Sequence, residues 1–296
     1  MIVNRDNLQN LYTGFKAVFQ AGFTAVNPLW MAIAMTVPST TRQEAYAWLG
    51  ATTKFREWLG DREIQNLEQH DYTIKNKSFE NTVGVDRDDI EDDTYGVYKP
   101  MFEQLGRDAK EHPDELVFNL LKAGWTTKCY DGENFFSATH KVKTGDTSAN
   151  VSNSGGGSGT PWYLIDDTRA IKPIIFQKRK DYQFVKMDQD TDEQVFSAKR
   201  LRYGVDCRCN VGFGLWQLAY GSKQTLNADN YQAARTAMMS MKGDNERPLN
   251  IRPTLLVVPP SLEKAALECV QTQRLANGAD NPLYNTAKVL VVPWLA

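Results

Sequence analysis

The longest helical pattern in the sequence covers residues 89–123, and it constrains the fold more than any other feature. Apolar side chains recur there at the 3.6-residue spacing of a helix that buries one face: Ile90, Val97, Tyr98, Met101, Phe102, Leu105, Ala109, Leu116, Val117, Leu120 and Leu121. Acidic residues between Asp88 and Asp93 stand at its start, where they complement the helix dipole, and Gly124 ends it. A helix of about 30 residues is predicted, compared with the usual 11–12.

Two prolines interrupt this helical pattern, at Pro100 and Pro113. Proline lacks the backbone N–H that an interior turn needs, and its ring clashes with the carbonyl of the preceding turn. The sequence therefore predicts a long helix that is kinked or loosened at both prolines. We treat Pro100 and Pro113 as candidate flex points of the helix.

The segment 46–88 is rich in aromatic residues but has no clean apolar face. Residues 72–85 have the pattern of a β-hairpin that turns at Asn76–Ser78, and such a hairpin is not stable without further contacts. Aromatic and arginine side chains are enriched in protein interfaces, so either a partner subunit or the chain's own domain supplies those contacts. The candidate inter-subunit contacts are Trp48, Arg56, Trp58, Tyr72, Lys75, Lys77 and Phe79.

The remaining sequence predicts a helix before this region, and strands and helices after it. An amphipathic helix is expected from residue 8 to residue 19, and Gly22 is expected to break it. Predicted strands cover 162–165, 171–177, 182–187, 193–203 and 207–218. A compact α/β unit is predicted from a helix at 227–242, a buried strand at 254–258, a short helix from Ser261 and a strand at 289–292.

Three motifs suggest a chemical function, and none of them meets its requirements. The glycine tract 152–159 lacks the flanking strand, helix and lysine of a phosphate loop, so a flexible surface loop is predicted. Cys207 and Cys209 would share one strand face, but a zinc site needs further ligands, and the sequence shows no second pair. His140 and Asp131 lack the nucleophile of a triad, so local hydrogen bonds are predicted. We therefore predict no catalytic, cofactor-binding or metal-binding residues.

Charge and hydropathy exclude further classes of protein. The formal net charge is −2, so no overall basic field exists to hold nucleic acid, and contact with DNA would be weak or local. No apolar stretch approaches the roughly 20 residues of a membrane span, and the first residues lack a signal-peptide pattern. We therefore expect synthesis in a cytoplasm, with the cysteines as reduced thiols.

Several blocks of sequence, in a fixed order, carry a family resemblance. They are Tyr46–Gly50, Arg56–Gly60, Asp92–Tyr98, His112–Val117, Tyr130–Phe136, Tyr203–Asn210, Gly212–Gly221 and Pro253–Pro260. In these blocks the chain resembles the Mu-like prophage major head subunit family, over nearly its whole length. The resemblance implies the major capsid protein of a Mu-like tailed phage, which is a structural protein of the virion and not an enzyme.

The resemblance also implies an α+β chain with the Hong Kong 97-type capsid fold. Residues 1–45 would form the N-terminal arm, and residues 46–88 the extended β-hairpin loop that reaches a neighbouring subunit. Residues 89–225 would form the peripheral domain, with the spine helix at 89–123. Residues 226–296 would form the α/β axial domain.

The function implied by the resemblance is self-assembly, as hexamers and pentamers, into an icosahedral head that encloses double-stranded DNA. The chain begins almost directly at the arm, so a separate scaffolding protein is expected, together with a maturation protease and a portal protein. Assembly would take place in the host bacterial cytoplasm, and no membrane is implied. Two alternatives stay open: an encapsulin-like compartment shell with protein cargo, and a hydrolytic enzyme that uses His140 and Asp131.

Overall fold

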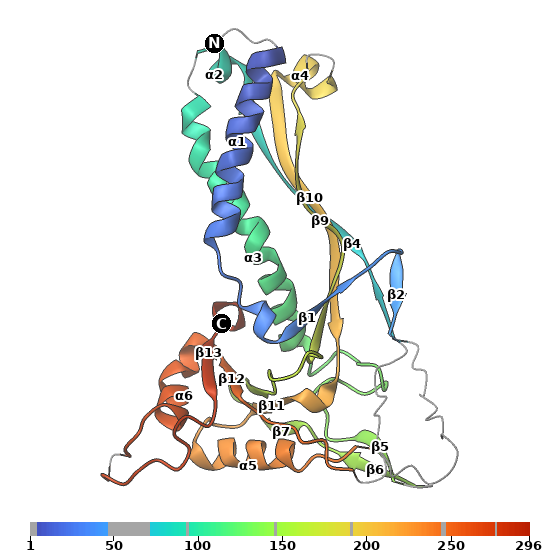
Figure 1. Cartoon of the computed structure of the whole chain (residues 1–296), viewed down its shortest axis with the longest axis vertical. Coiled ribbons are helices and arrows are strands. Elements are labelled where there is room, and N and C mark those ends of the chain that lie inside the picture. Colours follow the sequence, from blue (N-terminus) through green and yellow to red (C-terminus); the bar gives the residue numbers. More distant parts are fainter. Residues whose placement is uncertain are drawn as a thin grey trace, which may run out of the picture.

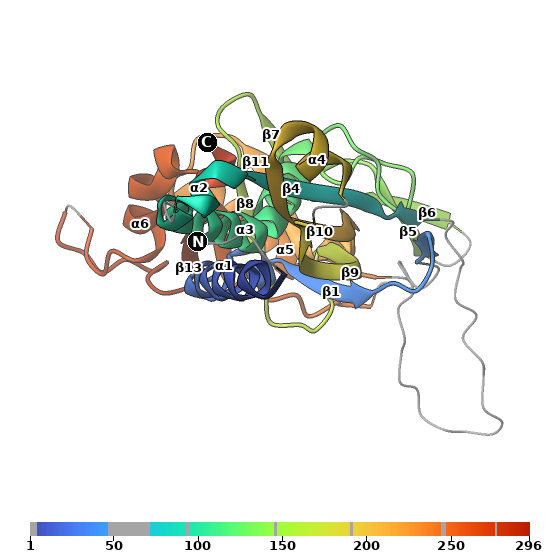
Figure 2. The ribbon, with the colours of Figure 1, turned by 90° about the horizontal axis from the view of Figure 1, so that it is seen from above.

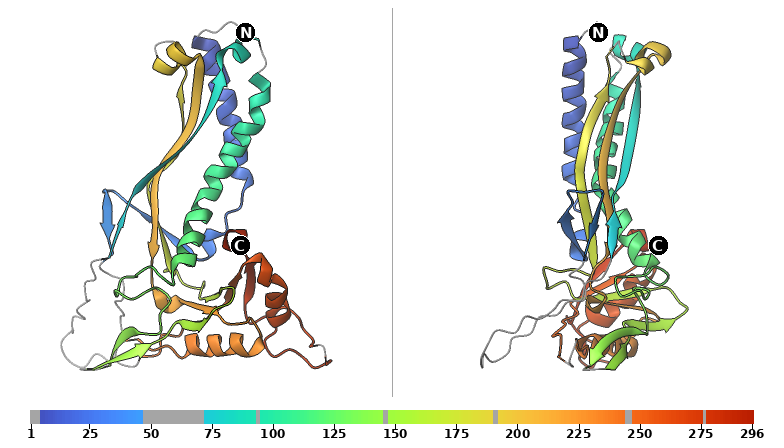
Figure 3. Two further views of the ribbon diagram at one scale, coloured as in Figure 1. Left: turned by 180° about the vertical axis from the view of Figure 1, so that it is seen from behind. Right: turned by 90° about the vertical axis from the view of Figure 1, so that its right-hand side faces the viewer.

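The computed structural model describes residues 5–46, 72–92, 95–144, 147–189, 192–243, 247–275 and 277–296. The chain has an elongated part, in which two long helices lie beside long strands, and a wider part built from short strands and helices (Figures 1 and 3). The first helix begins near the far end of the elongated part, and the C-terminus lies where the two parts meet. This mixed α/β architecture agrees with the predicted α+β class. Within the described ranges, no helix combines the length and apolar character that crossing a membrane requires.

The elongated part is built on a four-stranded sheet. Its strands are β1 (Ala34–Pro38), β4 (Lys77–Asp86), β9 (Ile174–Met187) and β10 (Arg200–Phe213), in the order β1-β9-β10-β4. β10 runs antiparallel to both of its neighbours, while β1 runs parallel to β9. Its helices are α1 (Arg5–Ala25), α2 (Arg87–Glu91), α3 (Lys99–Ala123) and α4 (Glu193–Ala198), with the 3-10 turns η1 (Trp30–Ala32) and η2 (Tyr95–Tyr98).

Helices α1 and α3 pack along each other and against the long sheet (Figures 1 and 2). Apolar side chains from all three surfaces form one core: Leu8, Leu11, Phe15, Phe19, Phe102, Leu105, Ala109, Phe184, Leu201, Tyr203 and Val205. The ring of Phe15 stacks on Phe102 with 4.1 Å between centroids, and lies edge-on to Tyr203 at 5.3 Å. Burying such a side chain stabilises a fold by about 1.5–3 kcal/mol. The buried apolar face of α1 therefore holds this helix against α3 and the long sheet.

Two glycines allow the backbones of α1 and α3 to touch where the helices cross. A Cβ atom on Gly106 would lie 2.1 Å from the carbonyl oxygen of Phe19, and one on Gly22 would lie 2.1 Å from that of Glu103. Each glycine thus faces the backbone of the other helix, and no side chain fits there. The prediction that Gly22 breaks the first helix was wrong, because α1 continues to Ala25 and uses Gly22 for close packing.

The wider part is built on a five-stranded sheet. Its strands are β7 (Ser154–Gly157), β8 (Trp162–Ile165), β11 (Ala219–Lys223), β12 (Leu255–Val258) and β13 (Lys288–Val291), in the order β13-β12-β8-β11-β7. β8 and β12 are buried at every position, as their unbroken apolar sequences predicted. The other elements are the strand pair β5 (His140–Thr144) and β6 (Thr147–Val151), helices α5 (Ala228–Met239) and α6 (Glu263–Val270), and the 3-10 turns η3 (Trp216–Leu218), η5 (Pro260–Leu262) and η6 (Pro293–Leu295).

The helix predicted for residues 89–123 is confirmed from Lys99 to Ala123. For residues 89–98 the prediction was wrong. The short elements α2 and η2 occupy the earlier residues, so α3 is a separate helix. Pro100 lies in the first turn of α3, where a missing N–H removes no intrahelical hydrogen bond. Its predicted place in the helix interior was therefore wrong. Pro113 does lie inside α3, and it is buried.

The hairpin predicted for residues 72–85 was wrong. β3 (Thr73–Lys75) and β4 follow one another across Asn76 and pair with different strands, β3 with β2 (Gln43–Ala45) and β4 with β10. The amide of Asn76 is buried and donates a hydrogen bond to Ser39, so this residue anchors the chain instead of turning it. β4 is an edge strand of the long sheet, and the sheet supplies the contacts that an isolated hairpin would lack.

Two further expectations change in the wider part and its connections. The glycine tract contains β7, an edge strand that runs parallel to β11. Glycine is required at Gly157, because its φ is +90° and a Cβ atom there would lie only 2.5 Å from the backbone of Lys223. The strand predicted at 193–203 begins as helix α4 and becomes β10 only at Arg200. β7, β8 and β11 share a sheet with β12 and β13, so this sheet crosses the predicted domain boundary at residue 226.

Candidate functional site

Two described stretches of the chain, ending at Tyr46 after β2 and resuming at Tyr72 before β3, lie side by side. The N–H of Tyr46 donates a hydrogen bond to the carbonyl of Tyr72 at 2.8 Å, and β2 and β3 pair antiparallel beside it. The two ends of the intervening segment are therefore fixed next to each other. We call residues 43–46, residues 72–76 and Gln177 the loop base. Three predicted inter-subunit contacts lie outside the described residues: Trp48, Arg56 and Trp58.

A buried glutamine of β9 holds the loop base together. The amide nitrogen of Gln177 donates to the side-chain oxygen of Asn76 at 2.8 Å and to the carbonyl of Ile74 at 3.1 Å. Its amide oxygen accepts a hydrogen bond from the Tyr46 hydroxyl at 2.8 Å. Because Gln177 is fully buried, water cannot replace these bonds if the side chain is removed.

The turn before β2 is fixed by one carboxylate. Glu44 accepts hydrogen bonds from the backbone N–H groups of Thr40 and Thr41 and from the Ser39 hydroxyl. These donors, the Thr40 N–H first among them, favour the charged form and lower the pKa of Glu44 to about 2. Asn76 donates to the same Ser39 hydroxyl at 2.8 Å, so this turn is tied to the loop base.

Two of the predicted inter-subunit contacts, Tyr72 and Phe79, pack within their own chain. The Tyr72 hydroxyl accepts a hydrogen bond from a backbone N–H of β10 at 2.8 Å, and burial raises the pKa of Tyr72 to about 12. The ring of Phe79 lies 4.4 Å from the ring of His112, centroid to centroid. Lys75 and Lys77, on β3 and β4, are exposed, so both side chains are accessible to another molecule.

Replacing Gln177 with leucine is expected to destabilise the chain by at least about 2 kcal/mol, because each buried polar group left without a partner costs about 1–3 kcal/mol. The free energy of unfolding in urea measures this loss. Limited proteolysis should also become faster at the loop base. The matched control is Gln183→Leu, an exposed position on the same strand, for which a change within about 0.5 kcal/mol is expected. Equal effects of the two substitutions would contradict the role of Gln177.

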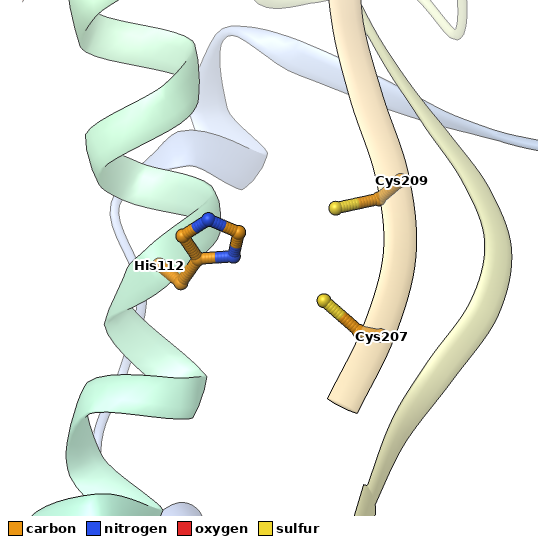
Figure 4. Close-up of side chains that lie close together, drawn as sticks. All are labelled: His112, Cys207 and Cys209. Atoms are coloured by element: carbon orange, nitrogen blue, oxygen red, sulfur yellow. The ribbon is translucent and has the colours of Figure 1, made fainter. Parts of the chain in front are cut away.

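The fold also brings His112 of α3 beside Cys207 and Cys209 of β10 (Figure 4). The prediction that the two cysteines share one face of a strand is confirmed. The sequence carried no signal for His112, because it arrives through a helix–strand contact between distant positions. A hydrogen bond between the two thiols lowers the pKa of Cys207 and raises that of Cys209. Both thiols are free and buried.

A second cluster surrounds the fully buried His140. Its Nδ1 lies 2.6 Å from a carboxylate oxygen of Asp131, and its Nε2 lies 3.2 Å from both the carbonyl of Phe135 and the side-chain oxygen of Asn153. Burial by itself would raise the pKa of Asp131, but hydrogen bonds from His140 and Cys129 outweigh it and leave that pKa lowered. Both ring nitrogens thus have partners in the chain, as the prediction of local hydrogen bonds requires.

Comparison with known proteins covers the chain from end to end. Residues 8–295 match the family model described as Mu-like prophage major head subunit gpT. The chain is 39% identical over 305 residues to the major capsid protein of Escherichia phage Mu, with 100% of both chains covered. It is 42% identical over 279 residues to the Mu-like prophage FluMu major head subunit of Haemophilus influenzae, covering 92% of this chain and 91% of that protein.

Solved structures give the same result for the fold. A chain of the bacteriophage JBD30 procapsid superimposes with a TM-score of 0.89 and 46% identity, covering 99% of this chain and 100% of its own. A chain of the JBD30 capsid superimposes with a TM-score of 0.80 and 35% identity, with 100% of both covered. Sequence and fold therefore agree over the full length, and the chain belongs to the family of Mu-like prophage major head subunits.

Proposed function

We propose that the chain is the major capsid protein of a Mu-like tailed phage and builds an icosahedral head from copies of itself. The observation that carries this proposal is the end-to-end match to the phage Mu major capsid protein at 39% identity. Such a head would contain hexamers and pentamers and would enclose double-stranded DNA. Its contacts would be individually modest and would hold the shell together through their number.

The loop base supports a contact between neighbouring subunits. Because the two ends of the segment between Tyr46 and Tyr72 are fixed side by side, a contact made by that segment would not change the register of β2 and β3. The residues proposed to contact the neighbour are Trp48, Arg56, Trp58, Lys75 and Lys77. Tyr72 and Phe79 would support them from within their own chain, where both are packed.

The proposed parts of the subunit follow the fold. Residues 1–45 would be the N-terminal arm, although α1 packs along α3 in the described conformation. Residues 46–88 would be the extended loop, and α3 would be the spine helix of a peripheral domain at 89–225. The axial domain at 226–296 would also include β7, β8 and β11, because they complete its sheet.

The described conformation resembles an unexpanded shell more than a mature one. The TM-score is 0.89 against the JBD30 procapsid and 0.80 against the JBD30 capsid, which supports this interpretation. We infer that α1 lies along α3 before the head expands. Pro113, inside α3, is the proposed flex point of that helix. Pro100 lies in the first turn, so any flexing there would occur at the start of α3 and not within it.

The proposed partners are a separate scaffolding protein, a maturation protease, a portal protein and packaged DNA, with assembly in the host bacterial cytoplasm. The net charge of −2 favours weak contact with DNA over tight binding. A hydrolytic role is disfavoured, because the ring nitrogens of His140 are already bonded within the chain. A compartment shell with protein cargo is disfavoured by the full-length phage relatives.

Electron microscopy of the full chain, expressed with the other head genes of its phage, tests the proposal. We expect closed particles in which this chain is the main component, and nuclease-resistant DNA inside those taken from a lysate. Monomers alone, in a preparation where the other head proteins assemble, would contradict it, and so would protein cargo in place of DNA. Images that resolve α3 before and after expansion also test Pro113, since an unchanged helix excludes a flex point there.

A further inference from the structure

Three side chains that bind soft metal ions meet between α3 and β10. His112 faces Cys207 and Cys209 across the gap between helix and strand (Figure 4). One ligand atom from each residue lies within 4.8 Å of the other two. The strand places both thiols on one face because a single residue separates them. The helix contributes the imidazole from the opposite side, so the three groups converge from two elements.

A fourth polar group completes this arrangement. The register between β9 and β10 shifts on both sides of Arg208, and Tyr182 of β9 lies at this irregularity. β-bulges of this kind redirect a side chain, and here the Tyr182 hydroxyl lies 2.6 Å from the Nδ1 of His112. In metal sites, a histidine ligand is usually oriented by a hydrogen bond to its ring. Tyr182 is therefore placed either to orient His112 or to approach a bound ion directly.

We propose that His112, Cys207 and Cys209 form a binding site for Zn²⁺ or another thiophilic divalent cation, with the Tyr182 hydroxyl beside it. Thiolate sulfur and imidazole nitrogen are the ligands that zinc prefers. With Zn–S distances of about 2.3 Å and Zn–N distances of about 2.0 Å, tetrahedral ligand atoms lie about 3.3–3.8 Å apart. The ligand atoms now lie up to 4.8 Å apart, so the distances between them would have to shorten by about 1 Å on binding. Rotation about the side-chain χ angles would bring them together.

Two of the three proposed ligands, His112 and Cys207, border a cleft through which an ion would enter. This cleft of about 390 Å³ is lined by His112, Cys207 and Tyr182. Three exposed acidic residues also line the cleft: Glu80, Asp108 and Glu115. Their negative charge attracts a cation to the mouth of the cleft and raises its local concentration there.

The other His/Cys/Asp group of the described residues is a weaker candidate. Cys129, Asp131 and His140 also lie close enough to share an ion. However, Asp131 already accepts hydrogen bonds from both Cys129 and His140, and the other ring nitrogen of His140 is bonded as well. An ion bound to the Nε2 of His140 would also have to displace its hydrogen bonds to Phe135 and Asn153, which lie outside the cluster.

The site would join α3 to the sheet immediately before Pro113, the one residue in the helix interior that cannot continue the backbone hydrogen bonding. A bound ion would add a bond between helix and strand at the position where α3 has lost one of its own. We infer that metal binding resists movement of α3 relative to β10. The inference does not depend on shell assembly, because the ligands all belong to one chain.

Titration of the intact, metal-free chain with Co²⁺ under reducing conditions tests the site. We expect one Co²⁺ per chain, with a thiolate-to-cobalt charge-transfer band in the near ultraviolet and the visible bands of tetrahedral cobalt. Zn²⁺ should displace the cobalt and raise the Tm of the chain, because an ion that binds only the folded state stabilises it. A spectrum without the thiolate band would overturn the proposal.

Variants locate the ion within the chain. Cys207→Ser and Cys209→Ser should each remove the charge-transfer band or reduce it strongly, and the zinc-induced rise in Tm should disappear. Tyr182→Phe should weaken binding by about 10–100-fold, the usual effect of losing a group that orients a ligand. Cys269→Ser, another buried thiol, is the matched control and should bind normally.

One further variant distinguishes the two clusters, because Cys129→Ser removes the thiol of the competing group. If the cobalt spectrum persists in Cys129→Ser and is lost in Cys207→Ser, the site at α3 is supported. The reverse pattern would place the ion at His140 and overturn the assignment. Circular dichroism of each variant shows whether it is folded. If Cys207→Ser and Cys209→Ser do not fold, the intensity of the charge-transfer band in the unmodified chain still decides the question, because two thiolates give about twice the intensity of one.

Discussion

Replacing Gly106 with valine is expected to separate α1 from α3 and to destabilise the chain by at least about 4 kcal/mol. A Cβ at this position would lie 2.1 Å from the carbonyl oxygen of Phe19 and 2.8 Å from the backbone nitrogen of Phe23. Neither contact involves a flexible side chain, so the helices themselves must move apart. The four buried apolar side chains of α1 would then lose their packing, each worth about 1.5–3 kcal/mol, which exceeds the usual effect of overpacking.

The free energy of unfolding in urea, followed by near-ultraviolet circular dichroism, measures the effect of Gly106→Val. Gly14→Ala provides the matched control, because Gly14 lies in the exposed part of α1 and a Cβ there meets nothing within 4 Å. That substitution should stabilise the chain by about 0.5–1 kcal/mol, since glycine is a poor helix former. If Gly106→Val unfolds at the same urea concentration as the original chain, the helix crossing does not hold α1.

Asp131→Ala is expected to destabilise the chain by at least about 2 kcal/mol at neutral pH, because His140 and Cys129 both lose a hydrogen-bond partner and each buried polar group left unpaired costs about 1–3 kcal/mol. The remaining partner, His140, is fully buried and stacks on Trp216 with 4.0 Å between ring centroids and 5° between ring planes. The ring therefore has no room to turn toward water. Asp280→Ala, which breaks an exposed pair with Arg274, should change the stability by less than about 1 kcal/mol.

The pH dependence of this prediction follows from the lowered pKa of Asp131 in the folded chain. A carboxyl group whose pKa is lower when folded stabilises the fold fully above its unfolded pKa of about 3.9. That contribution is lost as the pH falls through the folded pKa. The difference in unfolding free energy between the original chain and Asp131→Ala should therefore narrow below about pH 4. A difference that grows below about pH 4 would contradict the lowered pKa of Asp131.

Sequence periodicity predicted the elements whose environment is set locally. α5 was expected because its apolar residues follow one helical face, and β8 and β12 because short apolar runs suit strands that are covered on both sides. α3 was predicted from Lys99 onward for the same reason. Its start was placed too early, because the apolar spacing continues through Ile90 although α2 and η2 interrupt the helix.

Periodicity could not predict which elements meet. The pairing of β4 with β10 depends on residues more than a hundred positions away, whereas the local pattern around Asn76 predicts a turn. The glycine tract was expected to be flexible, because composition does not reveal that Gly157 is required for close approach to β11. His112 joins Cys207 and Cys209 only through the packing of α3 on the sheet. The full set of candidate ligands therefore appears only in the folded chain.

The hydrogen bond from the N–H of Tyr46 to the carbonyl of Tyr72 has a consequence for how such shells diversify. Where two chain ends are already held together, doubling the length of the segment between them adds only about 0.6 kcal/mol of closure entropy. Insertions and deletions at this point would therefore leave the folding of the subunit almost unchanged. The length of the segment can therefore change among related head subunits without altering the subunit core.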